Sequence, residues 1–249
     1  MSSVQLLRGE GLCRYFGGIK AVENVDIEIQ KGQFHSIVGP NGAGKTTLFN
    51  MLARQLDVTS GTLWFKGQAI TNVPGHQLPG LGIARTFQKT SLFASLTIRE
   101  NIRLAVQAKR LPVLPLIRKA DGYPDITART QAIVEQMRLD TIADSLVSET
   151  SHGDHRLTEI AVALGSEPEI LLLDEPMAGM SATEAALTVG MLKDLKRAIS
   201  IVLIEHDMDA VLELSDHVTV MDLGRIIAAG APEAVQNDPA VRRAYLGTD

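Results

Sequence analysis

Short bursts of alternating polar and apolar residues open the chain, a pattern typical of β-strands. Val25, Ile27 and Ile29 share one face of a predicted strand. The apolar residues 34–38 predict a further short strand that runs directly into a glycine-rich loop. Residues 46–54 then predict an amphipathic helix, so the local order is strand, loop and helix.

Helical spacing dominates the middle of the chain, after strand and turn signals in residues 60–87. The predicted helices there are 98–109, 128–138 and 157–165. Three prolines, at positions 112, 115 and 124, predict a loop over residues 111–127. After residue 168, strands and helices alternate as in βα units, which predicts a parallel sheet covered by helices. The predicted elements are strand 170–173, helix 183–198, strand 201–204, helix 208–214 and strand 217–221.

Composition agrees with a folded globular chain. The 249 residues, of which 45% are hydrophobic and 21% charged, predict one large domain or a core with a smaller lobe. The net charge of −5, with no run of like charges, disfavours nucleic acid as a partner. The single Cys13 suggests a reducing compartment, and no apolar stretch is long enough for a signal peptide or a membrane span. We therefore expect a cytoplasmic location.

Residues 39–46 match the phosphate-loop pattern G-x-x-x-x-G-K-[ST], between an apolar strand and an amphipathic helix. In this pattern backbone N–H groups surround phosphate oxygens, Lys45 reaches the β- and γ-phosphates and the Thr46 hydroxyl can ligate Mg²⁺. A glycine turn that only caps a helix is disfavoured by the full match. The expected nucleotide contacts here are Gly39, Pro40, Asn41, Gly42, Ala43, Gly44, Lys45, Thr46 and Thr47.

Two carboxylates end the aliphatic run 170–173, at the strand end where ligands gather in open α/β sheets. Asp174 is a candidate Mg²⁺ ligand, and Glu175 is placed to polarise the water that attacks the γ-phosphate. By themselves two acids at a strand end would more often be surface residues. Together with the phosphate loop they predict a catalytic site.

Lys45 and Asp174 are 174 − 45 = 129 positions apart, which implies an inserted lobe. With this order of motifs the chain resembles the ATP-binding subunits of ABC transporters. Gln88 falls at the Q-loop of that family, residues 150–154 at its signature, and His206 at its switch histidine. The resemblance implies an α/β P-loop fold of ABC type, with a mixed sheet core, an N-terminal antiparallel β subdomain and an inserted helical subdomain. We expect a single ABC ATPase domain over 1–249, with the core in about 1–90 and 166–249 and the helical subdomain in about 91–165.

Within that family the chain looks most like branched-chain amino acid importer ATPases, on the strength of residues 16–21, 205–208 and 243–247. The resemblance implies that Phe16 stacks on adenine and that Gln88 links Mg²⁺ and the attacking water to the permease. It also implies a head-to-tail dimer, in which Ser151 and Gly153 of one subunit complete the ATP site of the other. The second subunit is identical or paralogous.

The sequence departs from the family pattern at two places. Asp154 stands where the signature has glutamine, and a carboxylate about 4 Å from a phosphate charge would be repelled by about 4 kcal/mol at an effective dielectric near 20. We therefore expect Asp154 to lie in the first turn of its helix, where an acid is favourable by roughly 0.3–1 kcal/mol, away from nucleotide. Ser181 replaces the aspartate of the D-loop, which puts communication between the two ATP sites in question. The spacing of His152 and His155 is best explained by a solvated helix start rather than a metal site.

These features favour an ATP-hydrolysing importer subunit that uses ATP and Mg²⁺ and binds the inner face of the membrane through a permease. An external solute-binding protein would be an indirect partner. Glu175 and His206 are the expected catalytic residues, and Thr46, Gln88 and Asp174 the expected metal ligands. The open alternatives are a transporter of urea, amides or other polar solutes, a soluble ABC ATPase without a permease, and a nucleotide-bound scaffold without turnover.

Overall fold

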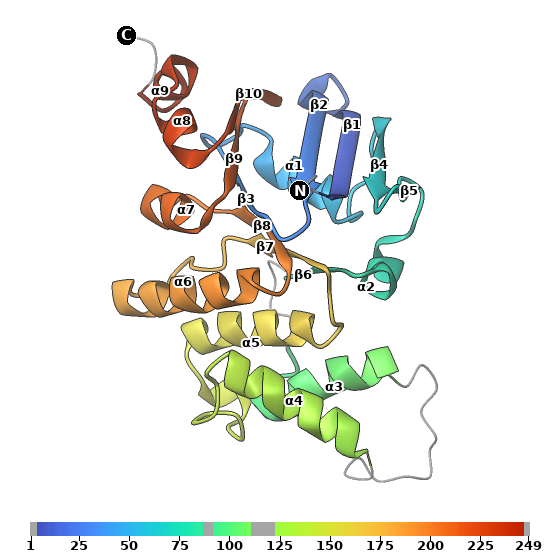
Figure 1. Cartoon of the computed structure of the whole chain (residues 1–249), viewed down its shortest axis with the longest axis vertical. Coiled ribbons are helices and arrows are strands. Elements are labelled where there is room, and N and C mark those ends of the chain that lie inside the picture. Colours follow the sequence, from blue (N-terminus) through green and yellow to red (C-terminus); the bar gives the residue numbers. More distant parts are fainter. Residues whose placement is uncertain (1–3, 87–91, 111–122, 247–249) are drawn as a thin grey trace. The chain divides into compact units, whose positions relative to one another are not determined.

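The computed structural model describes residues 4–86, 92–110 and 123–246. Contacts within the chain define two compact units. Figure 1 shows the chain coloured along its sequence. The first comprises Met1–Leu78, Leu172–Glu175 and Leu192–Asp249, and the second comprises Pro79–Leu171 and Pro176–Met191. Each unit is considered by itself below.

An antiparallel sheet of order β2-β1-β4-β5 forms part of the first unit. Its long strand β2 buries Val25, Ile27 and Ile29 and exposes the acids between them, as the alternation predicts. The antiparallel β subdomain of the predicted fold is therefore present. The strands are β1 (Gln5–Phe16), β2 (Ile19–Gln30), β4 (Ser60–Phe65) and β5 (Gln68–Ala69).

The second sheet has the order β10-β9-β3-β8-β7-β6. Strand β3 pairs in parallel with β8 and β9, whereas β10 pairs antiparallel with β9, so the sheet is mixed as the family resemblance implies. All residues of β3, β7 and β8 are buried, which explains their continuous apolar runs. The strands are β3 (Phe34–Val38), β6 (Ile83–Arg85), β7 (Ile170–Asp174), β8 (Ser200–Ile204), β9 (His217–Asp222) and β10 (Arg225–Gly230).

Four helices belong wholly to the first unit: α1 (Lys45–Leu52), α7 (Met208–Leu214), α8 (Pro232–Gln236) and α9 (Pro239–Leu246). Figure 1 shows α8 and α9 near the end of β10. A cluster of valines joins α7, α8 and α9 to strands β3 and β9: Val38, Val211, Val218, Val220, Val235 and Val241. The cluster includes Val38, the last residue of β3 before the glycine-rich loop.

The second unit is mainly helical, with α3, α4 and α5 packed together (Figure 1). Its elements include η3 (Val147–Glu149), α3 (Ile98–Arg110), α4 (Pro124–Gln136) and α5 (His152–Leu164). The short η1 (Gly75–Gln77) and α2 (Leu78–Leu81) lie near the boundary between the units, and α6 (Ala182–Lys196) crosses it.

Two predicted boundaries in this unit are wrong. Residues 124–127 are helical rather than part of a loop, because Pro124 occupies the first position of α4, where a missing N–H costs nothing. The rest of the predicted loop, residues 111–122, lies outside the described residues. Helix α5 begins at His152, five residues before the prediction, because Ser151 and Asp154 form a capping box at its start.

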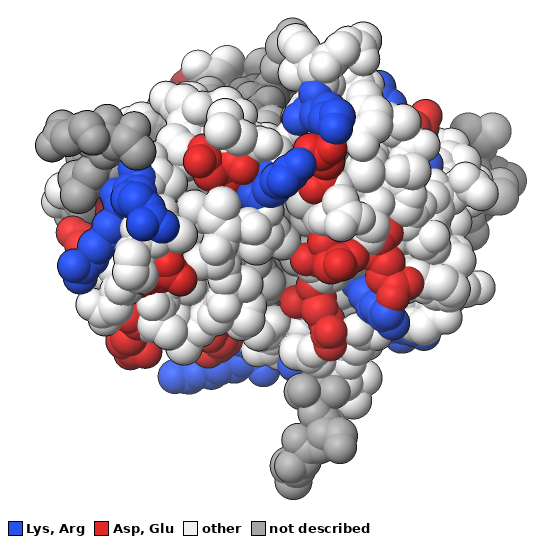
Figure 2. Space-filling model, turned by 90° about the horizontal axis from the view of Figure 1, so that it is seen from above, with Lys and Arg blue, Asp and Glu red and all other residues white. Residues whose placement is uncertain are grey.

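Two surface properties bear on function. Among the described residues, no helix is both long and apolar enough to cross a membrane. On the face shown in Figure 2, lysine and arginine side chains are interspersed with aspartate and glutamate among a larger uncharged area.

Candidate nucleotide-binding site

The glycine-rich loop between β3 and α1 turns sharply at three glycines. Gly39, Gly42 and Gly44 have φ values of 149°, 81° and 98°, which other residues rarely adopt. The Ala43 N–H donates to the Pro40 carbonyl oxygen at 3.2 Å, which closes the loop on itself. No side chain caps the N-terminus of α1, which follows Gly44, so this end of the helix suits an anionic group.

Lys45 is buried at the mouth of this loop, with 6% of its surface exposed. Its Nζ donates to the carbonyl oxygens of Gly39 at 2.7 Å and Pro40 at 3.0 Å. Burial lowers the pKa of Lys45, and the Glu175 carboxylate acts in the opposite direction. The ammonium group is therefore held over the loop by two neutral acceptors, which an anionic ligand could replace.

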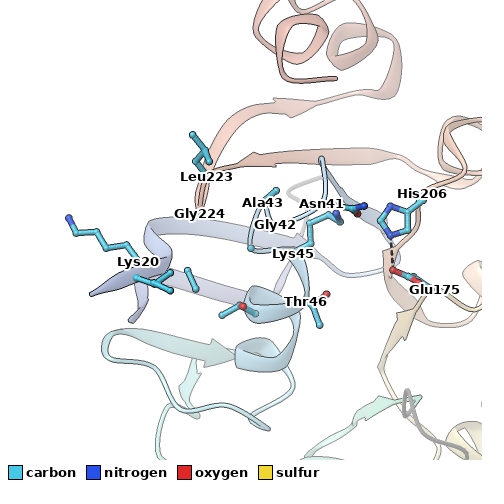
Figure 3. A pocket seen from close by; sticks show the side chains of 14 residues that line it. Lys20, Asn41, Gly42, Ala43, Lys45, Thr46, Glu175, His206, Leu223 and Gly224 are labelled. Atoms are coloured by element: carbon cyan, nitrogen blue, oxygen red, sulfur yellow. Dashed lines mark hydrogen bonds and ion pairs between the residues drawn. The ribbon is translucent and has the colours of Figure 1, made fainter. Parts of the chain in front are cut away.

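A cavity of about 420 Å³ opens beside the loop, within the first unit (Figure 3). It is lined by Ile19, Lys20, Ala21, Asn41, Gly42, Ala43, Gly44, Lys45, Thr46, Thr47, Glu175, His206, Leu223 and Gly224. Gly39 and Pro40 do not line it; they hold Lys45 instead.

The turn between β9 and β10 is a part of this cavity that our sequence analysis missed. The Gly224 N–H donates to the Ala43 carbonyl oxygen at 2.9 Å, and the Gly224 carbonyl oxygen accepts from the Glu23 N–H at 2.9 Å. Leu223 and Gly224 both have positive φ, as in a tight hairpin. The Leu-Gly pair follows the predicted strand 217–221, but the strand after it was not predicted, and nothing local signalled that this turn contacts the loop.

Glu175 and His206 meet at the wall of the cavity. His206 Nε2 lies 2.7 Å from Glu175 Oε1, as the dashed line in Figure 3 shows. Glu175 has a left-handed backbone, with φ 48°, and its N–H donates to the Ile204 carbonyl oxygen at 2.9 Å. This unusual backbone conformation, together with the hydrogen bond to Ile204, holds the Glu175 Cα in place and so limits where its carboxylate can lie. A carboxylate held in this way by an imidazole can accept a proton from a bound water.

Magnesium fits the residues present, as judged from their chemistry. Asp174, at the end of β7, is 4% exposed, and Thr46 lies in the first turn of α1. No group of three or more histidine, cysteine or acidic side chains suited to a metal ion occurs within residues 4–86, 92–110 and 123–246. One carboxylate, of Asp174, and one hydroxyl, of Thr46, suit Mg²⁺, which is commonly held by one or two carboxylates together with substrate phosphates and water.

The start of α5, in the second unit, carries a reciprocal set of hydrogen bonds. The Ser151 hydroxyl donates to Asp154 Oδ2 at 2.7 Å, the Ser151 N–H donates to the same carboxylate oxygen at 3.0 Å, and the Asp154 N–H donates to Ser151 Oγ at 3.1 Å. Asp154 therefore lies in the first turn of its helix, as predicted. Gly153 has Glu184 beside it, because a Cβ there would come within 2.8 Å of Glu184 Oε1.

A second reciprocal cap starts α6 in the same unit. The Ser181 N–H donates to Glu184 Oε2 at 2.8 Å, and the Ser181 hydroxyl donates to the same oxygen at 2.6 Å. The Ser181 hydroxyl and N–H lower the pKa of Glu184. Ser181 thus caps its helix, which gives it a local structural role.

Comparison with known proteins agrees with this geometry. Residues 22–178, more than half of the chain, match the family model described as ABC transporter. The chain belongs to this family. A second model, described as branched-chain amino acid ATP-binding cassette transporter, matches residues 225–249.

Several relatives of this ABC transporter protein match it over almost their whole length. It is 38% identical to the high-affinity branched-chain amino acid transport ATP-binding protein LivG of Escherichia coli K12, covering 98% of this chain and 99% of the relative. It is 34% identical to the corresponding BraF of Pseudomonas aeruginosa, covering 97% and 98%. A crystal structure of a nucleotide-free ATP-binding cassette aligns with TM-score 0.84 at 32% identity, covering 98% and 100%. The ADP conformation of the cassette MJ1267 aligns with TM-score 0.83 at 33% identity, covering 98% and 99%.

Membership settles the general activity and agrees with the predicted fold class. The protein is an ATP-binding cassette with ATPase activity that is coupled to transport. An ATPase subunit of a transporter in this family acts with a membrane permease.

Six of the predicted site residues that the structure describes do not line the cavity: Gly39 and Pro40, as noted above, and Phe16, Asp174, Ser151 and Gly153. Phe16, at the end of β1, is 45% exposed and is not among the residues that line the cavity; the Arg14 guanidinium lies 4.7 Å from its ring centroid. Ser151 and Gly153 belong to the second unit. Gln88 lies outside the described residues.

Proposed function

We propose that this chain hydrolyses ATP to drive the uptake of branched-chain or related amino acids through a membrane permease. The observation that carries the catalytic part is one cavity that contains both the Lys45 ammonium and the Glu175–His206 pair. The names of the relatives support the solute class.

In this proposal the residues of the site bind different parts of the Mg²⁺–ATP complex. Lys45 leaves the carbonyl oxygens of Gly39 and Pro40 and binds the β- and γ-phosphates, while Asn41 to Thr47 supply backbone N–H groups. Thr46 and Asp174 would hold Mg²⁺, with Gln88 as a third ligand, and the ion would neutralise charge on the phosphates. Phe16 would stack on adenine, with its second ring face covered by Arg14.

Glu175 would act on the attacking water. Its carboxylate accepts a proton as the water oxygen bonds to the γ-phosphorus and the bond to the ADP oxygen breaks, giving ADP and phosphate. His206 would keep the Glu175 carboxylate aimed at that water through their 2.7 Å contact. Its role is therefore to position Glu175.

The remaining partners follow from the same proposal. A second ATP-binding subunit, identical or paralogous, would present Ser151 and Gly153 to the γ-phosphate in a head-to-tail dimer. The permease would hold the protein at the cytoplasmic face of the cell membrane, and an external solute-binding protein would deliver the amino acid. The division into a core of about 1–90 and 166–249 and a helical subdomain of about 91–165 belongs to this proposal too.

The substitution Glu175→Gln tests the catalytic assignment. We expect ATP binding to persist, phosphate release to fall by at least about a hundredfold, and a dimer to accumulate with ATP. Glu135→Gln makes the same chemical change on α4 in the other unit and serves as the control. Unchanged phosphate release in Glu175→Gln would remove Glu175 from the mechanism.

Two further measurements test the transport assignment. Purification from detergent extracts should yield a polytopic membrane protein together with this chain, and its absence would favour an ABC ATPase that works without a permease. Deletion of the gene should abolish uptake of one or more branched-chain amino acids in a panel that also includes urea and amides. Loss of urea or amide uptake alone would overturn the amino acid assignment.

A further inference from the structure

The turn between β9 and β10 has an unusual residue at its first position. Strand β9 ends at Asp222 and β10 begins at Arg225, so the turn consists of Leu223 and Gly224 alone, with φ values of 45° and 80°. Two positive φ values in a two-residue hairpin are typical of a type I′ turn, which favours Asn-Gly or Asp-Gly. Leucine is disfavoured in this conformation because its Cβ comes too close to the backbone. The chain therefore has a residue here that does not suit the turn.

The Leu223 side chain is also highly exposed for an apolar group. Its exposed fraction of 81% is larger than that of any other large hydrophobic residue in the described part of the chain. Ile19, at the start of β2, is 70% exposed, and both side chains line the cavity beside the phosphate loop. Neither burial nor turn geometry explains a leucine at this position. Residues that break a local rule in this way are concentrated at functional sites.

Backbone contacts hold the turn against the phosphate loop. The Gly224 N–H donates to the Ala43 carbonyl oxygen at 2.9 Å, and the Gly224 carbonyl oxygen accepts from the Glu23 N–H at 2.9 Å. A Cβ at Gly224 would lie 2.8 Å from the Lys20 carbonyl oxygen, so these backbones pack closely. Leu223 is therefore presented from a backbone that is already fixed, which lowers the cost of ordering it when a ligand binds.

The place of Leu223 in the cavity indicates which part of ATP it can contact. Figure 3 shows Leu223 and Gly224 on the side of the loop opposite Glu175 and His206. The base and the γ-phosphate are the two ends of ATP. Because Glu175 is assigned to the γ-phosphate, the base lies toward Leu223. A base has a flat π-face, which can cover an aliphatic side chain and remove it from water.

We propose that Leu223 binds the adenine base of ATP from the tip of the β9–β10 turn, with Ile19 as a second apolar contact. This inference rests on the proposed function, because it takes Glu175 as the γ-phosphate end of the site. It adds an aliphatic contact to the stacking assigned to Phe16. The turn has an unfavourable residue because its side chain binds the base.

The substitution Leu223→Asn separates the two roles, since asparagine suits the turn but removes the apolar side chain. We expect the thermal midpoint to stay the same or rise, because asparagine adopts positive φ readily. The KM for ATP with Mg²⁺ should rise about fivefold, as expected when a partly covered leucine is removed, while kcat changes less than about twofold. Inorganic tripolyphosphate with Mg²⁺, which has no base, should inhibit ATP hydrolysis with the same inhibition constant in both proteins.

Two variants serve as controls. Leu223→Met keeps an apolar side chain of similar volume and should keep KM within about twofold of the original. Leu104→Asn makes the same chemical change at an exposed leucine of α3, in the second unit, and should leave KM unchanged.

Equal KM in the Leu223→Asn and original proteins would overturn the role of Leu223 and leave the proposed function intact. An equal rise in KM and in the inhibition constant of tripolyphosphate would overturn it too, because the turn would then act on the phosphate loop rather than on the base. Loss of association with the permease at unchanged KM would likewise replace the base contact by a protein contact. If the original protein neither bound nor hydrolysed ATP, the proposed function itself would be refuted.

Discussion

Replacing Asp154 by glutamine separates the hydrogen bonds that its side chain accepts at the start of α5 from the effect of its negative charge. The carboxylate accepts hydrogen bonds from the N–H and the hydroxyl of Ser151, which turns it back onto its own helix. Glutamine keeps an acceptor oxygen at this position of a capping box, so most of the cap survives. The lost part is the interaction of the negative charge with the helix N-terminus, roughly 0.3–1 kcal/mol at a partly exposed site.

This loss should lower the thermal midpoint by about 1–4 °C for a chain of this size. ATP hydrolysis should stay the same or rise, because the carboxylate is bound to its own helix away from nucleotide and its removal can only lessen repulsion of phosphate. Both quantities are measured on the intact protein with its permease. Asp154→Ala, which removes the acceptor as well, should cost roughly 1–2 kcal/mol and give the larger fall in midpoint.

A different outcome would refute the reasoning. If Asp154→Gln stayed folded, with a midpoint in the expected range, but lost more than tenfold in ATP hydrolysis, the acid itself would be required. The carboxylate would then act on nucleotide or on the opposite subunit, and the capping geometry would not account for its presence in the signature.

Three further substitutions test other parts of the structure. Gly44→Ala should weaken ATP binding by more than about tenfold in a titration, because a Cβ would overlap the Ala21 carbonyl oxygen; unchanged affinity would show that the loop can relax. His206→Ala should lower kcat at least about tenfold with little change in KM, since it removes the 2.7 Å partner of Glu175; equal falls in binding and turnover would contradict a positioning role. Burial lowers the pKa of His35 to about 3, below its value of 6.5 in the unfolded chain, so its contribution to stability is complete above pH 6.5 and is lost as the pH falls toward 3. Urea unfolding at pH 6.5 and pH 5 should show a loss of roughly 2 kcal/mol that His35→Gln reduces, and an identical loss in that variant would assign it to other groups.

Much of the fold could be predicted from local patterns. Fully buried strands such as β7 and β8 appear as uninterrupted aliphatic runs, and β2 alternates because only one of its faces is buried. Helices α8 and α9 were missed because they are short, although each begins with a proline at its first position. Pro124 was expected to prevent a helix, but at the first helical position its missing N–H costs nothing, so it begins α4 instead.

The site could be predicted only where its residues are close in sequence. The loop from Gly39 to Thr46 carries its chemistry in consecutive positions, so a pattern detects it. The approach of Gly224 to Ala43 depends on the packing of distant strands, which no local pattern encodes. Roles assigned to single residues of the site remain predictions for the experiments above.

The central claim is that the loop around Lys45 binds the triphosphate of ATP. Its most direct test is calorimetric titration of the purified chain with ATP and Mg²⁺, beside Lys45→Ala as the matched variant. We predict saturable binding by the original protein and its loss, by at least about a hundredfold in affinity, in the variant. Equal binding by the two proteins, or no binding by the original one together with its permease, would contradict the account.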